Sequence, residues 1–237
     1  VPAEVRYVIE NSGAETVITS PLVAPTVVKA AEGLEHFRQI LVCGPTDLPA
    51  CENIMPAIDD AELLDVMHEC QADDVAVLVY TSGTTGLPKA TTFFYARTFM
   101  GLALYAPTFI ANMMGRAGDV FYTCLPLFHG NALQLTTLPG FAAGFPVILS
   151  KRFSASRFWD IIRKYGVTNF NLLGSMPHFL LKQPEKPSDR DNPVWRVNSA
   201  ACPKELIEVF ERRFDVKVYE AYGAVDGGGF MLGTFGR

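Results

Sequence analysis

The sequence lacks the basic excess of a surface built to bind nucleic acid. It carries 25 Asp and Glu residues against 20 Lys and Arg residues, which gives a formal net charge of -5 at pH 7. Proteins that neutralise phosphate backbones usually show a clustered excess of Lys and Arg. We therefore expect no nucleic-acid partner.

Cysteines are few, and their spacing marks neither a disulfide framework nor a metal site. The five are odd in number, widely spaced and without a C-x-x-C pair, which excludes both signatures. They are Cys43, Cys51, Cys70, Cys124 and Cys202. Because free thiols persist in a reducing compartment, this usage predicts a cytoplasmic protein.

The amino terminus lacks the basic and apolar regions of a secretory signal peptide. It also lacks an initiating Met, so we expect the natural protein to begin upstream. One stretch, Phe93–Met114, approaches the roughly 20 apolar residues that cross a bilayer. It contains Arg97, and a charge inside a spanning helix is costly. We expect a buried or interfacial helix here, with a transmembrane helix as the less favoured alternative. Peripheral membrane contact is compatible with this expectation.

Short apolar runs alternate along the chain with amphipathic stretches. The runs have the length and composition of buried strands: Glu15–Thr19, Gln39–Cys43, Val75–Tyr80, Val120–Leu125, Pro146–Leu149, Thr168–Leu173 and Val216–Glu220. Helical patterns cover Pro2–Ser12, Asp59–Cys70, Ser154–Tyr165 and Pro203–Phe214. This alternation predicts an α/β fold with mostly parallel sheets flanked by helices, and ligands that bind beyond the carboxyl ends of the strands.

The length and composition allow one large domain or two lobes. With 237 residues, 49% of them hydrophobic, the chain can bury a substantial core. A weak break between sub-lobes is expected near Ser150. The polar, proline-containing stretch Gln183–Pro193 predicts an exposed loop.

The segment Tyr80–Lys89, with the sequence YTSGTTGLPK, has the chemistry of a polyphosphate site. Its glycines let backbone amides approach an anion, its threonines and serine add hydroxyl donors, and its lysine adds a cation. The Walker pattern is absent, because Pro88 precedes the lysine and Ala90 follows it, so a P-loop NTPase is not implied. A polar surface turn is the alternative.

This decapeptide resembles the phosphate-binding loop of the adenylate-forming superfamily, which includes acyl-CoA synthetases, luciferases and peptide-synthetase adenylation domains. Three later stretches resemble further motifs of the superfamily in the same order. Leu125–Asn131 is similar to its P-x-F-H motif, Ser199–Leu206 to its adenine-side loop, and Tyr219–Asp226 to its Y-G-x-T-E motif. The resemblance covers nearly the whole chain and implies the inner part of the large N-terminal, AMP-binding domain.

The resemblance also implies the residues of the site. Thr85, Lys89 and His129 would be catalytic, and Asp226 would hold Mg²⁺. The nucleotide would be bound by Thr81, Ser82, Gly83, Thr84, Thr85, Gly86, Lys89, Ser199, Ala200, Ala201, Tyr222, Gly223 and Asp226. Phe128 and His129 would lie where the acyl pocket meets the coenzyme A channel. His36, His68 and His178 match no motif and are interpreted as structural.

The chain departs from the superfamily pattern at two single residues and in one three-residue loop. Asp226 stands in place of the metal-binding glutamate and is one methylene shorter, which changes the metal geometry. Val225 stands in place of a threonine and has no hydroxyl for a phosphate. The glycine-rich adenine loop is replaced by Ser199–Ala201, where a Cβ is expected to tighten or shift the pocket.

The implied activity is the ATP-dependent conversion of a carboxylic acid to an acyl-adenylate and then to acyl-CoA, with ATP, Mg²⁺ and coenzyme A. Lys151–Trp159 resembles a segment of the fatty-acid transport proteins and, more loosely, of crotonobetaine/carnitine-CoA ligases, which predicts a fatty acid. The chain ends before the ribose-binding aspartate and the C-terminal catalytic domain of the superfamily, so we expect the chain alone to be inactive. The alternatives are a non-catalytic nucleotide- or acyl-binding homologue and a membrane-associated fatty-acid uptake protein.

Overall fold

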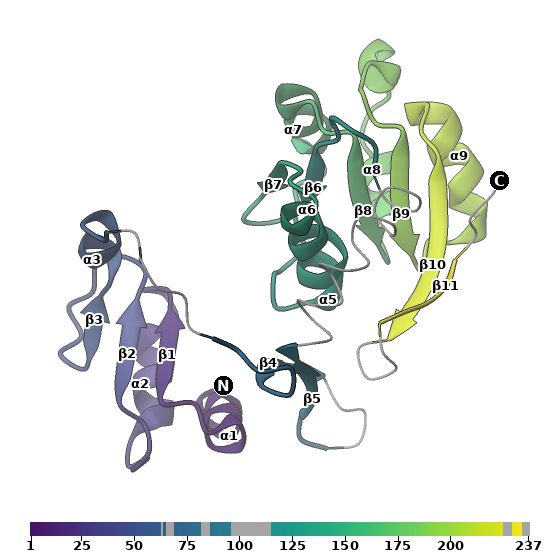
Figure 1. The fold of residues 1–237 in the computed structure, drawn as a ribbon. Coiled ribbons are helices and arrows are strands. Elements are labelled where there is room, and N and C mark those ends of the chain that lie inside the picture. The colour runs from purple at the N-terminus through teal and green to yellow at the C-terminus, as the bar shows by residue number, and fades with distance from the viewer. Residues whose placement is uncertain (63, 65–68, 82–85, 96–114, 225–228, 234–237) are drawn as a thin grey trace. The chain divides into compact units, whose positions relative to one another are not determined.

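The computed structural model describes residues 1–62, 64, 69–81, 86–95, 115–224 and 229–233. The chain forms two compact units, Val1–Glu69 and Cys70–Arg237, and each is considered by itself (Figure 1). The division therefore falls between Glu69 and Cys70, and Ser150 lies inside the second unit.

The first unit is a small parallel α/β layer. Its strands are β1 (Thr16–Thr19), β2 (Gln39–Val42) and β3 (Cys51–Asn53), paired in that order, and its helices are α1 (Pro2–Ser12), α2 (Ala24–Ala31) and α3 (Met55–Asp59). Val27 of α2 packs against Ile40 and Val42 of β2 in a small apolar cluster. The predicted helix Pro2–Ser12 is confirmed, and it ends at Gly13, whose φ of 69° only glycine adopts without strain.

The predicted helix at Asp59–Cys70 is wrong in the part that the structure describes. Residues 60–62, 64, 69 and 70 are not helical, and residues 63 and 65–68 lie outside the described part. The helix of this region is α3, which begins earlier because Pro56 favours a first helical turn. Asp59 and Asp60 then fall at its carboxyl end, where the helix dipole disfavours negative charge.

The second unit is built on a six-stranded sheet in the order β11-β10-β9-β8-β6-β7. Its strands are β6 (Phe121–Thr123), β7 (Val147–Leu149), β8 (Asn169–Leu173), β9 (Arg196–Ala200), β10 (Val218–Ala224) and β11 (Gly229–Gly233). All neighbouring pairs are parallel except β10 with β11. The predicted α/β class with mostly parallel sheets is therefore confirmed.

Two strands of the second unit form a separate antiparallel hairpin, β4 (Val75–Thr81) and β5 (Lys89–Phe94). Phe93 and Phe94, which begin the apolar stretch considered for a membrane helix, belong to β5, and residues 96–114 of that stretch lie outside the described part. Among the described residues, no helix has the length and apolar character needed to cross a bilayer.

The apolar core of the second unit lies on one face of the six-stranded sheet. Tyr122, Phe170 and Val197 of neighbouring strands pack there against the helices α7 (Phe158–Tyr165), α8 (Met176–Leu181) and α9 (Lys204–Phe214). The rings of Trp159 and Phe214 stack with their centroids 4.4 Å apart, so α7 and α9 contact each other over the same face of the sheet. Figure 1 shows α8 and α9 behind the sheet and α5 and α6 in front of it.

Helix α7 begins later than predicted. Residues 155–157 form a turn, and Arg157 is the N-cap, so the helix starts at Phe158 instead of Ser154. The predicted buried side chains Phe158, Trp159 and Ile162 are confirmed.

The predicted exposed loop Gln183–Pro193 contains a buried ion pair. Asp189, in the short 3-10 helix η3 (Pro187–Arg190), accepts a hydrogen bond from Arg213 Nε at 2.7 Å, and both side chains are 9% exposed. Arg213 also donates to the carbonyls of Leu181, Gln183 and Pro184. The predicted exposed loop is confirmed for most of its residues, and Asp189 is the buried exception, because the arginine on α9 satisfies both its carboxylate and the loop carbonyls.

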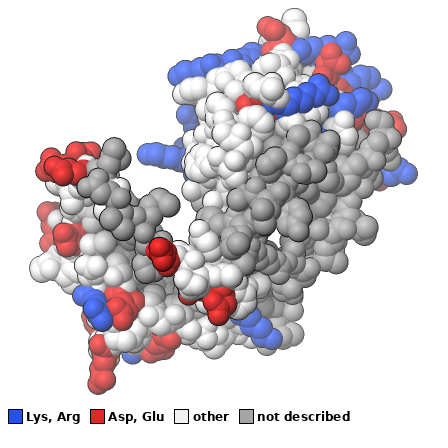
Figure 2. Space-filling view, viewed as in Figure 1, with Lys and Arg blue, Asp and Glu red and all other residues white. Residues whose placement is uncertain are grey.

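A shallow hollow of about 340 Å³ lies beside this ion pair, and it is lined by Glu185, Lys186, Pro187, Asp189, Arg190, Val209, Arg212 and Arg213. These residues come from the loop before β9 and from the last turns of α9. The hollow therefore lies toward the edge where the strands begin, and Figure 2 shows Lys and Arg gathered along that edge, at the top of the view. It is on the opposite edge from the predicted ligand site.

Replacing Arg213 by Leu should lower the free energy of unfolding by about 3–5 kcal/mol, because it leaves the buried Asp189 carboxylate unpaired. Urea unfolding followed by circular dichroism would measure the change. Lys217→Ala is the control, since its ion pair with Glu211 involves a lysine that is 65% exposed; about 0.5 kcal/mol or less is expected there. Equal losses in the two variants would contradict the anchoring role of Arg213.

Candidate functional site

The predicted phosphate loop connects the two strands of the β4–β5 hairpin. Thr81 and Lys89 are partners in the register, and Thr81 Oγ1 donates to the Lys89 carbonyl at 3.3 Å. Gly86 is exposed and has room around it, whereas Ser82, Gly83, Thr84 and Thr85 lie outside the described residues. The hydrogen bond from the Thr81 hydroxyl thus joins the two ends of the loop. Among the described residues of the loop, Lys89 supplies a cation, and its side chain is exposed.

The adenine-side loop lies at the carboxyl edge of β8, β9 and β10. The Gly174 amide donates to the Ala200 carbonyl at 3.1 Å, which ties the end of β8 to the end of β9. The Cys202 amide donates to Glu220 Oε1 at 3.2 Å, which ties the loop to β10. Ser199, the strand partner of Glu220, is buried. The end of β8 and the Glu220 side chain of β10 therefore hold the loop that follows β9, as expected for a ligand site of a parallel sheet.

Ala201 lies in the left-handed backbone region, with φ of 61°. A Cβ in this region collides with the following carbonyl, at a cost of roughly 1–2 kcal/mol. The sequence-based expectation concerned contact of a Cβ with the adenine base. The structure adds a second consequence of the missing glycine, namely backbone strain in the loop itself.

Tyr222 lies near the end of β10, two residues beyond Glu220, and its side chain is 60% exposed. A tyrosine ring in this position presents a face on which a planar base can stack. Gly223 follows at a shift in the β10–β11 register. Val225 and Asp226 lie outside the described residues, so their predicted roles remain predictions.

His129 lies after β6 and caps the short helix α5 (Gly130–Ala132). Its Nδ1 accepts a hydrogen bond from the Asn131 amide at 3.2 Å, which leaves Nε2 as the protonated nitrogen of the neutral ring. His129 is exposed, and the neighbouring Phe128 side chain is 81% exposed. An imidazole N–H donor and an apolar ring thus stand together on the surface.

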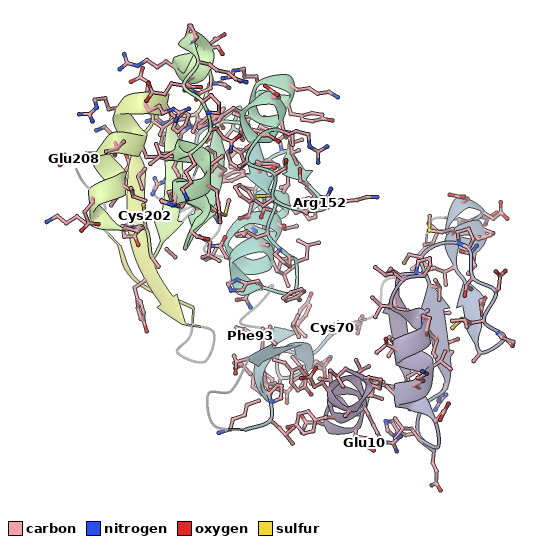
Figure 3. All side chains as sticks on the ribbon, turned by 180° about the vertical axis from the view of Figure 1, so that it is seen from behind. Glu10, Cys70, Phe93, Arg152, Cys202 and Glu208 are labelled. Carbon is pink, nitrogen blue, oxygen red and sulfur yellow. The ribbon has the colours of Figure 1, made fainter. Side chains whose placement is uncertain are left out.

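Two cysteines near these loops are unsuited to nucleophilic chemistry. Burial raises the pKa of the Cys124 thiol, at the end of β6, to about 11. Burial, followed by the Glu220 carboxylate, raises the pKa of the Cys202 thiol, which is labelled in Figure 3. A raised pKa favours the thiol over the thiolate, so neither cysteine has the lowered pKa of an activated nucleophile.

A chain of buried amides was missed from the sequence. Asn171 of β8 and Asn198 of β9 are strand partners, and Asn198 Nδ2 donates to Asn171 Oδ1 at 3.2 Å. Asn171 Nδ2 donates in turn to Asn131 Oδ1 at 2.9 Å. The alternation N-F-N at residues 169–171 was the available signal, because it places polar side chains on one face of a strand that looks wholly buried.

A mostly parallel α/β sheet with a polar loop at its carboxyl edge is typical of α/β proteins that bind a ligand at this edge. The chain matches the family model described as AMP-binding enzyme over residues 1–235, and it belongs to this family. The resemblance to the adenylate-forming superfamily is thereby confirmed, and the relatives of the chain include acyl-CoA synthetases and fatty acid transport proteins.

Similar curated proteins include the steroid-22-oyl-CoA synthetase of Rhodococcus jostii, 35% identical over 96% of this chain and 39% of its own length. The long-chain fatty acid transport protein 2 of Rattus norvegicus is 33% identical over 95% of this chain and 38% of its own length. The chain therefore spans about two fifths of the length of these relatives.

Solved structures support the same fold. A benzoate CoA ligase from Burkholderia xenovorans superposes with a TM-score of 0.80 at 22% identity, covering 98% of this chain and 45% of its own. The o-succinylbenzoate coenzyme A synthetase of Bacillus subtilis, solved in complex with ATP and magnesium ion, gives a TM-score of 0.75 at 22% identity, with coverages of 99% and 44%.

Ala201→Gly should raise the free energy of unfolding by about 1 kcal/mol, because glycine adopts the positive φ without strain. Ala200→Gly is the matched control, since Ala200 is in the extended strand β9, and a loss of about 0.5–1 kcal/mol is expected there. Urea unfolding of both variants would show whether the free energy of unfolding rises in Ala201→Gly and falls in Ala200→Gly. Destabilisation by Ala201→Gly would show that the strain is absent.

Proposed function

We propose that the chain is the inner part of the N-terminal, AMP-binding domain of a longer acyl-CoA synthetase. The observation that carries this proposal is the carboxyl edge of the large sheet, where Ser199–Cys202 is tied to β8 and β10 and Tyr222 is exposed nearby. Family membership supports it. Because the chain spans about two fifths of its relatives, we assign the activity to the longer protein that contains it.

The proposed reaction has two steps. A substrate carboxylate attacks the α-phosphorus of ATP, an acyl-adenylate forms and pyrophosphate leaves. The thiol of coenzyme A then loses its proton and attacks the acyl carbonyl, so a thioester forms and AMP leaves. Both steps develop charge on phosphate oxygens, and positioned cations and hydrogen-bond donors stabilise that charge.

The residues of the chain divide this work among three segments. Lys89 and the hydroxyls of Ser82, Thr84 and Thr85 would bind the polyphosphate, with backbone amides at Gly83 and Gly86. Ser199, Ala200, Ala201, Tyr222 and Gly223 would hold the adenine. Asp226 would hold Mg²⁺, a hard cation that prefers carboxylate oxygen and that lowers the charge of the polyphosphate when it is bound. The Thr81 hydroxyl would serve the loop by closing its base.

A fatty acid is the proposed substrate. Two relatives are named for long-chain fatty acid transport and for medium/long-chain fatty acid ligation. In this chain, the side chains of Leu127 and Phe128, which precede His129, are 45% and 81% exposed. They form an apolar surface that an acyl chain would cover.

Pyrophosphate release by the full-length protein tests the function. With ATP, Mg²⁺ and a panel of short, medium and long fatty acids and carnitine-like acids, we expect release with one chain-length class and a thioester once coenzyme A is added. ATP binding without release for any acid would instead support a non-catalytic nucleotide-binding protein. It would also implicate Val225 and Asp226, the two departures from the family motif.

Lys89→Ala should slow pyrophosphate release by a factor on the order of 10², because it removes a cation from the developing negative charge. The same assay on Lys164→Ala provides the control, since Lys164 is an exposed lysine on α7 beside the Tyr165 ring. Unchanged adenylate formation in Lys89→Ala would remove the assignment of the loop.

A further inference from the structure

The segment that carries His129 is hydrogen-bonded to one side chain of the sheet, that of Asn171 in β8. Asn171 Nδ2 donates to Asn131 Oδ1 at 2.9 Å and to Thr136 Oγ1 at 2.8 Å. The Thr136 hydroxyl in turn donates a hydrogen bond to the Asn131 backbone carbonyl, at 3.2 Å. One buried amide therefore fixes both ends of the stretch from α5 to the π-helix η2 (Leu133–Thr137).

The same amide is fixed in turn by the strand that ends in the adenine-side loop. Asn198 Nδ2 donates to Asn171 Oδ1 at 3.2 Å, and Arg196 Nε donates to Asn198 Oδ1 at 2.9 Å. Asn171 and Arg196 are 7% and 6% exposed. Because Asn171 and Arg196 are shielded from water, the hydrogen bonds that they make with the half-buried Asn198 are costly to leave unmade.

The connection reaches the imidazole through one residue. The Asn131 side-chain oxygen accepts a hydrogen bond from Asn171, and the Asn131 backbone amide donates one to His129 Nδ1 at 3.2 Å. The position of the Asn131 amide decides which ring nitrogen accepts, and so which one carries the proton. Asn171 is therefore connected, through Asn131, to a ring that it does not touch.

We propose that Asn171 is a positioning residue for His129, holding its segment in register with β9 and keeping the imidazole in the Nε2-protonated form. This inference rests on the proposed function for its kinetic consequence only. Since His129 is assigned to the meeting point of the acyl and coenzyme A sites, a misplaced ring should slow thioester formation more than pyrophosphate release.

The neighbouring Asn169 offers a matched control. It lies on the same strand and the same face, it is fully buried, and its amide donates to Thr168 Oγ1 rather than to the His129 segment. Asn171→Leu and Asn169→Leu delete similar amides at similar depth. Asn131→Ala breaks the connection at the next residue, in the short helix α5, and keeps the backbone amide that faces His129.

The first readout is histidine nitrogen NMR of the full-length protein at about pH 8, where imidazole is neutral. The signal of His129 is identified by its loss in His129→Gln. We expect a single Nε2-protonated tautomer in the unchanged protein and in Asn169→Leu, and a mixture of tautomers in Asn171→Leu and Asn131→Ala. An unchanged spectrum in Asn171→Leu overturns the proposal; if that variant does not fold, Asn131→Ala decides in the same way.

The second readout separates the two chemical steps. We expect thioester formation to fall about tenfold in Asn171→Leu and Asn131→Ala while pyrophosphate release changes less than about twofold. Equal loss in both steps, or the same loss in Asn169→Leu, would show a merely structural role. If the unchanged protein releases no pyrophosphate, the proposed function fails, and the NMR result still decides whether Asn171 positions His129.

Discussion

The register between β8 and β9 is the constraint on which the second unit depends. It pairs Phe170 with Val197 and Asn171 with Asn198. The first pair faces the aromatic core beneath α7 and α9, and the second pair belongs to the buried amide chain. A slip of one residue would exchange the two faces, placing asparagines in the core and phenylalanine against the polar segment. Both faces therefore select the same register.

This register also aligns the carboxyl ends of the strands where the predicted ligand loops begin. The end of β8 is tied to β9 by the Gly174 amide, and the loop after β9 is tied to β10 by the Glu220 carboxylate. These ties explain how Ala201 can hold a positive φ between them. Local strain persists when the surrounding structure determines the backbone more strongly than the residue does.

The two kinds of polar burial in this unit have different roles. The ion pair of Asp189 and Arg213 anchors the loop before β9 at the edge where the strands begin, and its role is to stabilise the folded state. The chain of side chains from Arg196, at the start of β9, to Asn131 runs along the face of the sheet opposite the apolar core and ends at His129. Between the buried Arg196 guanidinium and His129 the chain consists of neutral amides, each of which can donate and accept without a further charge being removed from water.

The sequence by itself determined the fold class, most strand positions and the motif segments, because these depend on local periodicity and on residue types at short spacing. It predicted the helix after residue 59 wrongly, because the proline that starts α3 outweighed the acidic pattern. Only the tertiary structure decided the burial of Asp189, the strain at Ala201 and the link from Asn171 to His129. Each of these joins residues or backbone positions that the chain brings together only when the sheet pairs, so no local pattern contains them.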